Sequence, residues 1–170
     1  MNAKNAATEF TTILPGAVFG PVLGAGNLGS VQVIERLLRG RPPALPRIGF
    51  WVVDVRDLAD LHIRAMTSAN AEGQRFLAAG DFMWMEDIAK TLRSSLDEQA
   101  DRVPRRILPN FAVKLMLPFL PRFRTLAPLL GRRYPLTSDK ARELLGFSPR
   151  PATATIVDCA RSLLSVDAGR

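Results

Sequence analysis

The chain has 170 residues, of which 47% are hydrophobic and 23% charged, and its formal net charge is +7. This length and balance are typical of one globular domain with a core of its own. No apolar run of the kind found in a signal peptide stands near its start, and no stretch reaches the roughly 20 apolar residues of a membrane helix. The single cysteine, Cys159, cannot form an internal disulfide, so we expect a reducing, cytoplasmic setting and no membrane.

The positive charge is concentrated in one stretch. Between Arg102 and Arg133 there are eight Lys or Arg and no Asp or Glu. Such a stretch could bind phosphates. However, its basic residues alternate with prolines and large apolar residues, and no known nucleic-acid-binding motif accompanies them. We therefore expect no nucleic-acid partner and keep a basic nucleic-acid or anionic-surface binder as the least favoured alternative.

The first part of the chain alternates strands and helices around a glycine-rich loop. In chain order the pattern predicts a buried strand at 11–14 closed by Pro15, a loop as far as Ser30, a helix at 31–39, a strand at 50–53 and a helix from Asp57, its N-cap, to Met66. Gly40 ends the first of these helices. The only histidine, His62, falls on the predicted inner face of the second helix, which favours a packed residue over a catalytic base.

The rest of the chain is mostly helical. In order, the pattern predicts a strand at 75–79, a helix at 85–96, two short helices around 110–117 and 124–130, a helix that Thr137 or Ser138 caps and Gly146 ends, and a last helix near 153–165. Cys159 is predicted to be a buried thiol on that last helix. Short strands separated by helices indicate an α/β fold. The first strand, however, needs neighbours that these residues do not supply.

One glycine motif matches a nucleotide-binding pattern. Gly24-Ala25-Gly26-Asn27-Leu28-Gly29 has the G-x-G-x-x-G spacing of dinucleotide sites. It does not directly follow a strand, and no strand ending in Asp or Glu arrives about 20 residues later. We therefore expect a flexible loop here rather than a pyrophosphate site.

Other polar residues are weak candidates for catalysis. Asp57 and Asp60 lie three positions apart on one helix, where a cap and an exposed side chain explain them better than a catalytic dyad. Tyr134 is followed by Pro135 and has Ser138, not lysine, four positions later, so it is not predicted to be a proton donor. No cluster of His, Cys and carboxylates has metal-ligand spacing. We expect neither a catalytic residue nor a metal site.

Four ordered segments carry a family resemblance. They are ILPGAVFGP at 13–21, VDVRDLADLH at 53–62, FLAAG at 76–80 with EDIA at 86–89, and SDKARELLGFSPRP at 138–151. Together they resemble the extended short-chain dehydrogenase/reductase family (the NAD-dependent epimerase/dehydratase family), in its dihydroflavonol-reductase-like and aldehyde-reductase branch. The similarity covers nearly the whole chain from about residue 10.

The resemblance implies the C-terminal, substrate-binding half of an extended Rossmann-type reductase, with few short strands and several helices. Residues 11–30 would be the last Rossmann strand and the loop beside the nicotinamide, and 31–170 the substrate-binding region. The family's glycine motif and its Tyr-x-x-x-Lys pair, which protonates a carbonyl while the nicotinamide delivers hydride, would precede residue 1. We expect an intact enzyme that reduces an aldehyde or ketone, or oxidises the alcohol, with NAD or NADP. The 170 residues alone are expected to be inactive and to bind the cofactor weakly or not at all.

The resemblance also implies two groups of site residues. The cofactor group, beside the nicotinamide, is Pro15, Gly16, Ala17 and Val18. The substrate group is Phe19, Gly20, Pro21, Phe50 and Trp51, although Phe50 and Trp51 are equally well explained as core aromatics. The Pro and Gly residues fit a rigid turn where backbone approaches a ligand closely.

A non-enzymatic alternative stays open. The backbone N–H and C=O groups at the edge of strand 11–14 would favour pairing with another strand. The chain could therefore be a fragment that self-associates or binds a partner chain supplying the missing sheet.

Overall fold

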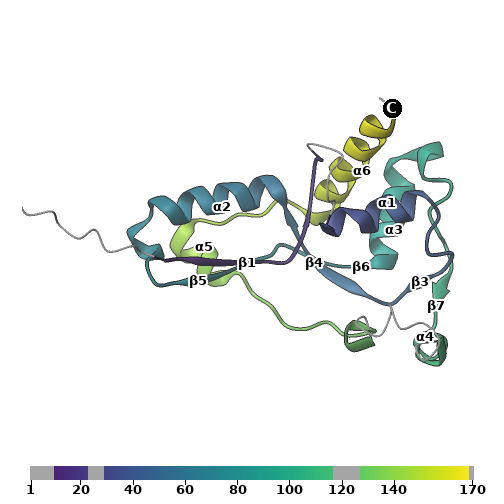
Figure 1. Ribbon diagram of the computed structural model, residues 1–170, viewed down its shortest axis with the longest axis horizontal. Coiled ribbons are helices and arrows are strands. Elements are labelled where there is room, and N and C mark those ends of the chain that lie inside the picture. Colours follow the sequence, from purple (N-terminus) through teal and green to yellow (C-terminus); the bar gives the residue numbers. More distant parts are fainter. Residues whose placement is uncertain (1–9, 23–28, 117–126, 169–170) are drawn as a thin grey trace, which may run out of the picture.

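The strands of the described residues form three small sheets rather than one (Figure 1). The computed structural model describes residues 10–22, 29–116 and 127–168. The sheets are β1 (Thr12–Pro15) with β5 (Arg75–Ala78), β2 (Ala17–Phe19) with β4 (Gly49–Asp54) and β6 (Phe82–Trp84), and β3 (Leu45–Pro46) with β7 (Ile107–Leu108). All pairs are parallel except β4 with β6, which is antiparallel. The expected α/β class, with few short strands, is confirmed.

Six α-helices lie among the described residues. They are α1 (Gln32–Leu38), α2 (Val55–Thr67), α3 (Met85–Ser95), α4 (Asn110–Met116), α5 (Asp139–Leu145) and α6 (Ala152–Ala168). Each overlaps a helix that the sequence predicts. The further helix expected around 124–130 lies in part outside the described residues. Strands β2 and β6 were not predicted, because three residues carry too little periodicity to show a strand.

Strand β1 is less buried than its composition predicts. Leu14 faces Leu77 in the parallel register and is 41% exposed, whereas Phe76, on the other face of β5, is fully buried. Within the described residues β5 is the only neighbour of β1. The expectation of a buried strand is therefore wrong: β1 is an edge strand, and its second edge lacks a pairing partner in this part of the chain.

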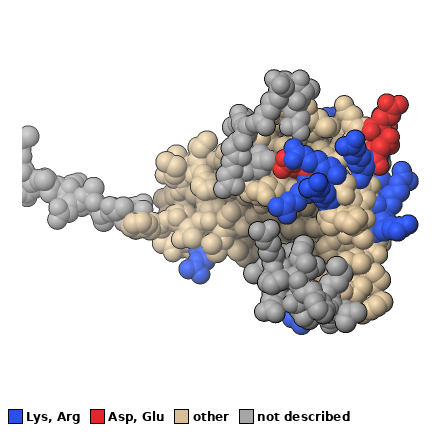
Figure 2. Space-filling view, turned by 45° about the vertical axis from the view of Figure 1, so that its right-hand side comes forward, with Lys and Arg blue, Asp and Glu red and all other residues tan. Residues whose placement is uncertain are grey.

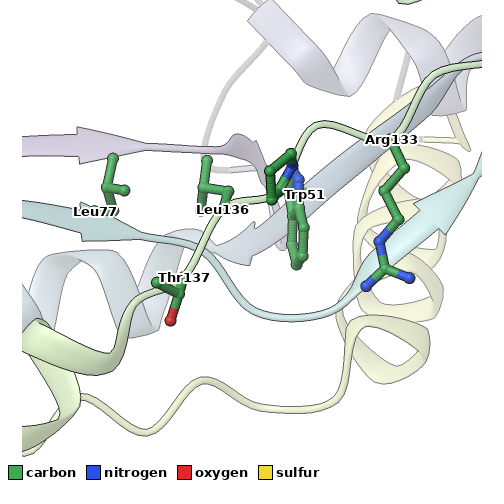
Figure 3. Close-up of a pocket in the computed structure, with 6 residues that line it drawn as sticks. Trp51, Leu77, Arg133, Leu136 and Thr137 are labelled. Atoms are coloured by element: carbon green, nitrogen blue, oxygen red, sulfur yellow. The ribbon is translucent and has the colours of Figure 1, made fainter.

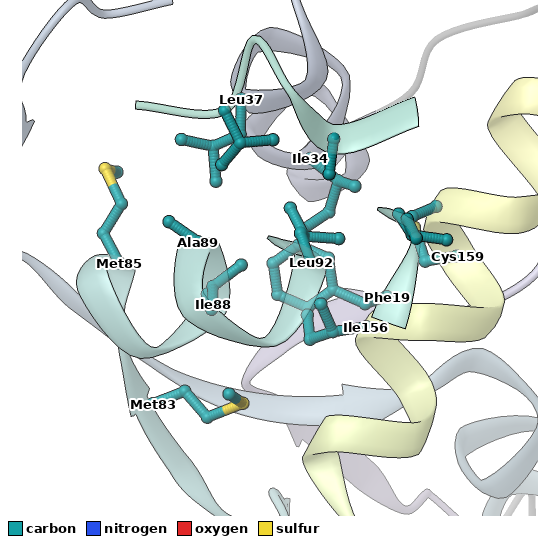
Figure 4. Packing of buried hydrophobic residues seen from close by; sticks show 14 of the residues in the cluster. Phe19, Ile34, Leu37, Met83, Met85, Ile88, Ala89, Leu92, Ile156 and Cys159 are labelled. Atoms are coloured by element: carbon teal, nitrogen blue, oxygen red, sulfur yellow. The ribbon is translucent and has the colours of Figure 1, made fainter. Parts of the chain in front are cut away.

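Two hydrophobic clusters join the sheets to the helices. The larger cluster packs β2, β4 and β6 against α1, α3 and α6, and its fully buried side chains include Phe19, Ile34, Leu92, Ile156 and Cys159 (Figure 4). The smaller cluster packs α2 and α5 against β1 and β5, through Leu61, Phe76, Ala141 and Phe147 among others. In Figure 1 helices α2 and α5 with strands β1 and β5 lie at the left, and helices α1, α3 and α6 lie at the right. The burial of Cys159 on α6 is confirmed.

Helix α2 begins earlier than predicted. Its N-cap is Asp54, whose side chain accepts a hydrogen bond from the backbone N–H of Arg56, so the prediction of Asp57 as the cap is wrong. His62 is exposed and its Nδ1 lies 2.7 Å from the carbonyl oxygen of Leu58, which corrects its placement on the inner face. The buried face of α2 is formed by Leu61 and Ala65 instead.

Helix α5 ends as the sequence predicts but begins differently. Gly146 has a left-handed φ of 63°, and the N–H of Phe147 donates to the carbonyl of Ala141 beyond it. At the start, Thr137 Oγ1 accepts from the N–H of Asp139, whereas the hydroxyl of Ser138 makes no cap hydrogen bond. Ser138 instead accepts from the N–H and donates to the carbonyl of Ala79, at 2.9 Å each, and so ties α5 to the end of β5.

The basic surplus lies at the surface. Arg102, Arg105 and Arg106 are all exposed. In Figure 2, blue side chains gather on the right-hand part of the molecule, where red ones are few. Solvent can therefore screen these charges without a bound partner.

Candidate functional site

The segment from Pro15 to Val18 carries the chain from the first sheet to the second. Pro15 is the last residue of β1, and Ala17 begins β2 beside β4. Between them, the N–H of Gly16 donates to the carbonyl of Ala78 at 2.9 Å. A Cβ at position 16 would lie 2.3 Å from the carbonyl oxygen of Trp51. Glycine is needed here because any side chain would push the crossing away from β4.

The residues predicted to border the substrate divide between two faces of β4. Phe19 is 1% exposed, and its ring meets that of Phe50 edge-on with centroids 6.3 Å apart, in the larger cluster. Trp51, the next residue of β4, points the other way because side chains alternate along a strand. Trp51 therefore lines a surface hollow while Phe50 belongs to the core.

Gly20 and Pro21 leave β2 beside the start of α2. Gly20 has φ of 124°, and a Cβ there would lie 3.1 Å from Asp54 Oδ1. One residue beyond Pro21, the N–H of Val22 donates to the hydroxyl of Ser162 on α6 at 2.7 Å. The loop is thus held from both sides before it enters residues 23–28, which lie outside the described part of the chain together with Gly24 and Gly26 of the glycine motif.

A cavity of about 540 Å³ opens on the Trp51 face of the second sheet (Figure 3). We call it the Trp51 pocket, and its lining residues are Trp51, Leu77, Arg133, Pro135, Leu136 and Thr137. Three distant pieces of the chain form it: β4, β5 and the segment 133–137 that runs across them toward α5. Its walls are mainly apolar, with one charged side chain.

Arginine side chains stack on the aromatic face beside this pocket. The guanidinium carbon of Arg133 lies 5.1 Å from the ring centroid of Trp51 and 5.0 Å from that of Phe82. The rings of Trp51 and Phe82 meet edge-on at 5.4 Å, and Trp84 continues the row at 4.9 Å from Phe82. The indole N–H of Trp51 donates to the carbonyl of Tyr134 at 2.9 Å, which fixes the Trp51 ring.

A buried carboxylate anchors the other end of β4. The Asp54 side chain is fully buried and accepts from Nε and Nη2 of Arg56 at 2.8 Å each. Burial by itself would raise the pKa of Asp54, but hydrogen bonds from Arg56 and Thr155 and the charge of Arg150 outweigh it and hold that pKa below its ordinary value. Asp54 is therefore ionised and structural, not a proton donor.

Asp57 and Asp60 do not form a dyad. Asp57 pairs with Arg150 at 2.7 Å, and the N–H of Arg150 also donates to it at 2.8 Å. Asp60 pairs with Arg64, one turn along α2, at 2.7 Å. Both carboxylates are therefore held in ion pairs, although Asp57 is not the cap that the sequence predicts.

The side chains of Tyr134 and Cys159 also have structural rather than catalytic roles. The hydroxyl of Tyr134 donates to the carbonyl of Pro128 at 3.0 Å. Burial raises the pKa of the Cys159 thiol to about 11, so it is not a nucleophile at neutral pH. Among the described residues no group of His, Cys, Asp and Glu could hold a metal ion, and no helix is both long and apolar enough to cross a bilayer.

Sequence reasoning missed Arg133, Leu77 and Leu136. Leu77 lies in the FLAAG segment, which gave no sign of a site, and Arg133 and Leu136 belong to no motif. The two ends of the Trp51–Tyr134 hydrogen bond lie 83 residues apart. No local pattern could have brought them together, since the pocket exists only where segment 133–137 crosses the sheet.

The chain is similar to known reductases in sequence and in fold. No family model matches the chain. It is 28% identical over 167 residues to a ketoreductase of Aspergillus niger, covering 92% of the chain and 44% of that protein. It is 25% identical to the yeast methylglyoxal/isovaleraldehyde reductase Gre2 complexed with NADPH, with a TM-score of 0.70, covering 95% of the chain and 48% of that structure. The chain is thus similar, over most of its own length, to reductases like those of the family that its motifs resemble.

Two further matches are also a reductase and an oxidoreductase. Gre2 of Candida albicans in complex with NADPH has a TM-score of 0.71 at 22% identity, over 96% of the chain and 46% of that structure. An uncharacterised oxidoreductase of Schizosaccharomyces pombe is 30% identical over 103 residues, covering 58% of the chain and 30% of that protein. The chain spans about half the length of the reductases it matches over most of its own length, consistent with the C-terminal half that its motifs resemble.

Proposed function

We propose that the chain is the substrate-binding half of an NAD(P)-dependent carbonyl reductase. In this proposal Pro15, Gly16, Ala17 and Val18 lie beside the nicotinamide ring, and the loop at Gly20 and Pro21 borders the substrate. The observation that carries it is the crossing at Gly16. There the backbone passes, without a side chain, from the parallel pair of β1 and β5 to the parallel pair of β2 and β4, in a chain similar to reductases that were solved with NADPH.

The backbone at this crossing suits an amide-bearing ring. Strand β2 is at the edge of its sheet, with β4 as its only neighbour in the described residues. No strand of the described residues pairs with its outer edge, so backbone N–H and C=O groups there could pair with the carboxamide of a nicotinamide. Once bound, that cofactor would supply the hydride. The role of these residues is to hold the ring's position and to keep water from one side of it.

These 170 residues contain no proton donor of the family's kind. A tyrosine that protonates a carbonyl needs a lysine nearby to lower its pKa. The only tyrosine, Tyr134, has Ser138 four positions later, and its hydroxyl is engaged with Pro128. We therefore propose that the chain by itself does not catalyse the reduction of a carbonyl compound.

The test is NADPH oxidation with methylglyoxal and isovaleraldehyde as substrates. We expect no turnover by the purified chain, and turnover when it is fused behind the cofactor-binding half of the yeast reductase. A fusion carrying Gly16→Val is the matched control and should be inactive. Turnover by the chain alone would overturn the proposed inactivity. A folded fusion that binds NADPH but reduces no carbonyl compound would overturn the reductase assignment.

A second candidate function is non-enzymatic: the chain would be a fragment that pairs with another copy of itself or with a partner chain. Leu14 is 41% and Phe10 76% exposed, and one edge of β1 has no pairing strand among the described residues; such edges favour pairing with another chain. The solution mass of the purified chain tests this. A dimer that loses its partner when Leu14 is changed to lysine would support it, and a stable monomer would contradict it.

A further inference from the structure

We propose that the Trp51 pocket binds a small organic carboxylate with an apolar body. The substrate class of the reductase would then be aldehydes or ketones that carry a carboxylate. That last step rests on the proposed function, whereas binding of the carboxylate does not.

Arg133 is the group that would recognise the anion. It lines the pocket, is exposed, and pairs with no carboxylate of the described residues; its contacts are the faces of Trp51 and Phe82. A guanidinium stacked on aromatic rings keeps its N–H groups pointing outward around its edge. That edge can donate two parallel hydrogen bonds to one carboxylate.

The remaining walls fit the apolar body of such a ligand. In Figure 3 Leu77 and Leu136 lie together on one side of Trp51, and Arg133 lies on the other side. The cavity of about 540 Å³ falls within the range of about 300–1,000 Å³ found for small-molecule sites. Thr137 adds one hydroxyl, so a ligand with a single charged end and an otherwise apolar surface matches the lining best.

The pocket is also held in shape before any ligand arrives. The indole N–H of Trp51 is bonded to the Tyr134 carbonyl, and the Tyr134 hydroxyl to the carbonyl of Pro128. Binding would therefore order few side chains, which reduces its entropic cost.

The pocket adjoins the proposed nicotinamide side. The backbone carbonyl of Trp51 is the group that packs against Gly16, while its side chain lines the pocket. Trp51 thus contacts both the pocket and the crossing at Gly16. A ligand whose carboxylate is bound by Arg133 would therefore have its aldehyde or ketone carbonyl directed toward that crossing.

Calorimetric titration of the purified chain tests the site with two probes, 3-phenylpropionate and its neutral amide. We expect the carboxylate to bind at least about tenfold more tightly than the amide, as a charge-assisted bidentate contact would require. Arg133→Gln should remove this preference and leave amide binding unchanged. Arg133→Lys should recover only part of it because lysine lacks the planar fork. The matched control is Arg132→Gln, because Arg132 is exposed and adjacent but does not line the pocket. This substitution should change the affinity for the carboxylate less than about twofold.

The outcomes separate this inference from the proposed function. Neither probe is an aldehyde or ketone, so binding is read without turnover. Three results would each overturn the carboxylate site, even if the reductase fusion is active. They are equal affinity for the two probes, no binding of either probe, and an equal loss of carboxylate affinity in Arg132→Gln and Arg133→Gln. Unchanged amide binding shows that the Arg133→Gln variant is folded.

Discussion

Replacing Asp54 with asparagine should lower the free energy of unfolding by about 2–3 kcal/mol. The side chain of Asp54 is fully buried, caps α2, and accepts hydrogen bonds from both the backbone and the guanidinium of Arg56. Asparagine keeps the size but removes the charge and turns an NH2 group toward the guanidinium donors. The chain would then bury an amide where it now buries a paired carboxylate.

The expected loss lies below the roughly 3–5 kcal/mol of a broken, fully buried ion pair. Arg56 is 40% and Arg150 34% exposed at the side chain, so solvent takes up part of the lost interaction. Each also keeps another carboxylate: Asp158 lies 2.7 Å from Arg56, and Asp57 lies 2.7 Å from Arg150. For a chain of this length the loss corresponds to a fall in Tm of about 5–10 °C.

The assay is urea unfolding followed by circular dichroism, with Asp60→Asn as the matched control. Asp60 is on the same helix, and its ion pair with Arg64 has side chains 56% and 47% exposed, so its loss should cost less than about 0.5 kcal/mol. Equal costs for the two variants would refute the argument that burial and the arginine network make Asp54 important. A cost below about 0.5 kcal/mol for Asp54→Asn would refute it as well.

The same residue predicts a pH dependence. The pKa of Asp54 in the folded chain is lower than the ordinary 3.8 to which unfolding returns it. The unfolded state therefore binds the proton more readily, and the contribution of Asp54 to stability is present above about pH 3.8 and lost as the pH falls through its native pKa. The stability difference between wild type and Asp54→Asn should be constant from about pH 7 to pH 5 and shrink in stronger acid. A difference that grows on acidification would contradict this.

Three further predictions concern the crossing, the core and the end of β5. Gly16→Ala should destabilise the chain by about 1–3 kcal/mol in urea unfolding, because its Cβ would lie 2.3 Å from the Trp51 carbonyl oxygen; an unchanged midpoint would show that the crossing can shift freely. Cys159, fully buried and with its pKa raised to about 11, should not react with a thiol reagent at about pH 8 until the chain is unfolded, and rapid reaction in the native state would contradict its burial. Ser138→Ala should cost about 1–3 kcal/mol, because it leaves the N–H and carbonyl of Ala79 without their partner; a calorimetric Tm equal to wild type would contradict that role.

The helices were the most predictable part of the fold. Apolar residues repeat at the helical period in α1, α3 and α6, and the left-handed Gly146 ends α5 as a glycine after such a run should. The buried position of Cys159 follows from the same periodicity. These features depend on residues within a few turns of one another, so a single sequence is enough to show them.

The exact placement of the cap on α2 was not predictable locally. Asp54 and Asp57 are both residue types that cap helices. Arg150, 93 residues away, pairs with Asp57, and Arg56 engages Asp54. Only the packing of the segment around Arg150 against the start of α2 decides which carboxylate caps the helix and which accepts the distant arginine.

By itself the sequence determined the α/β class, most helix positions and the resemblance to a family of reductases, because these depend on local periodicity and on the order of motifs. The tertiary structure alone decided that β1 is an edge strand, that Phe50 packs in the core while Trp51 lines a pocket, and that Arg133 lies on Trp51. Each of these depends on which distant backbone segment covers a given face. Neighbouring residues of one strand point in opposite directions, so composition cannot tell which of them will meet solvent.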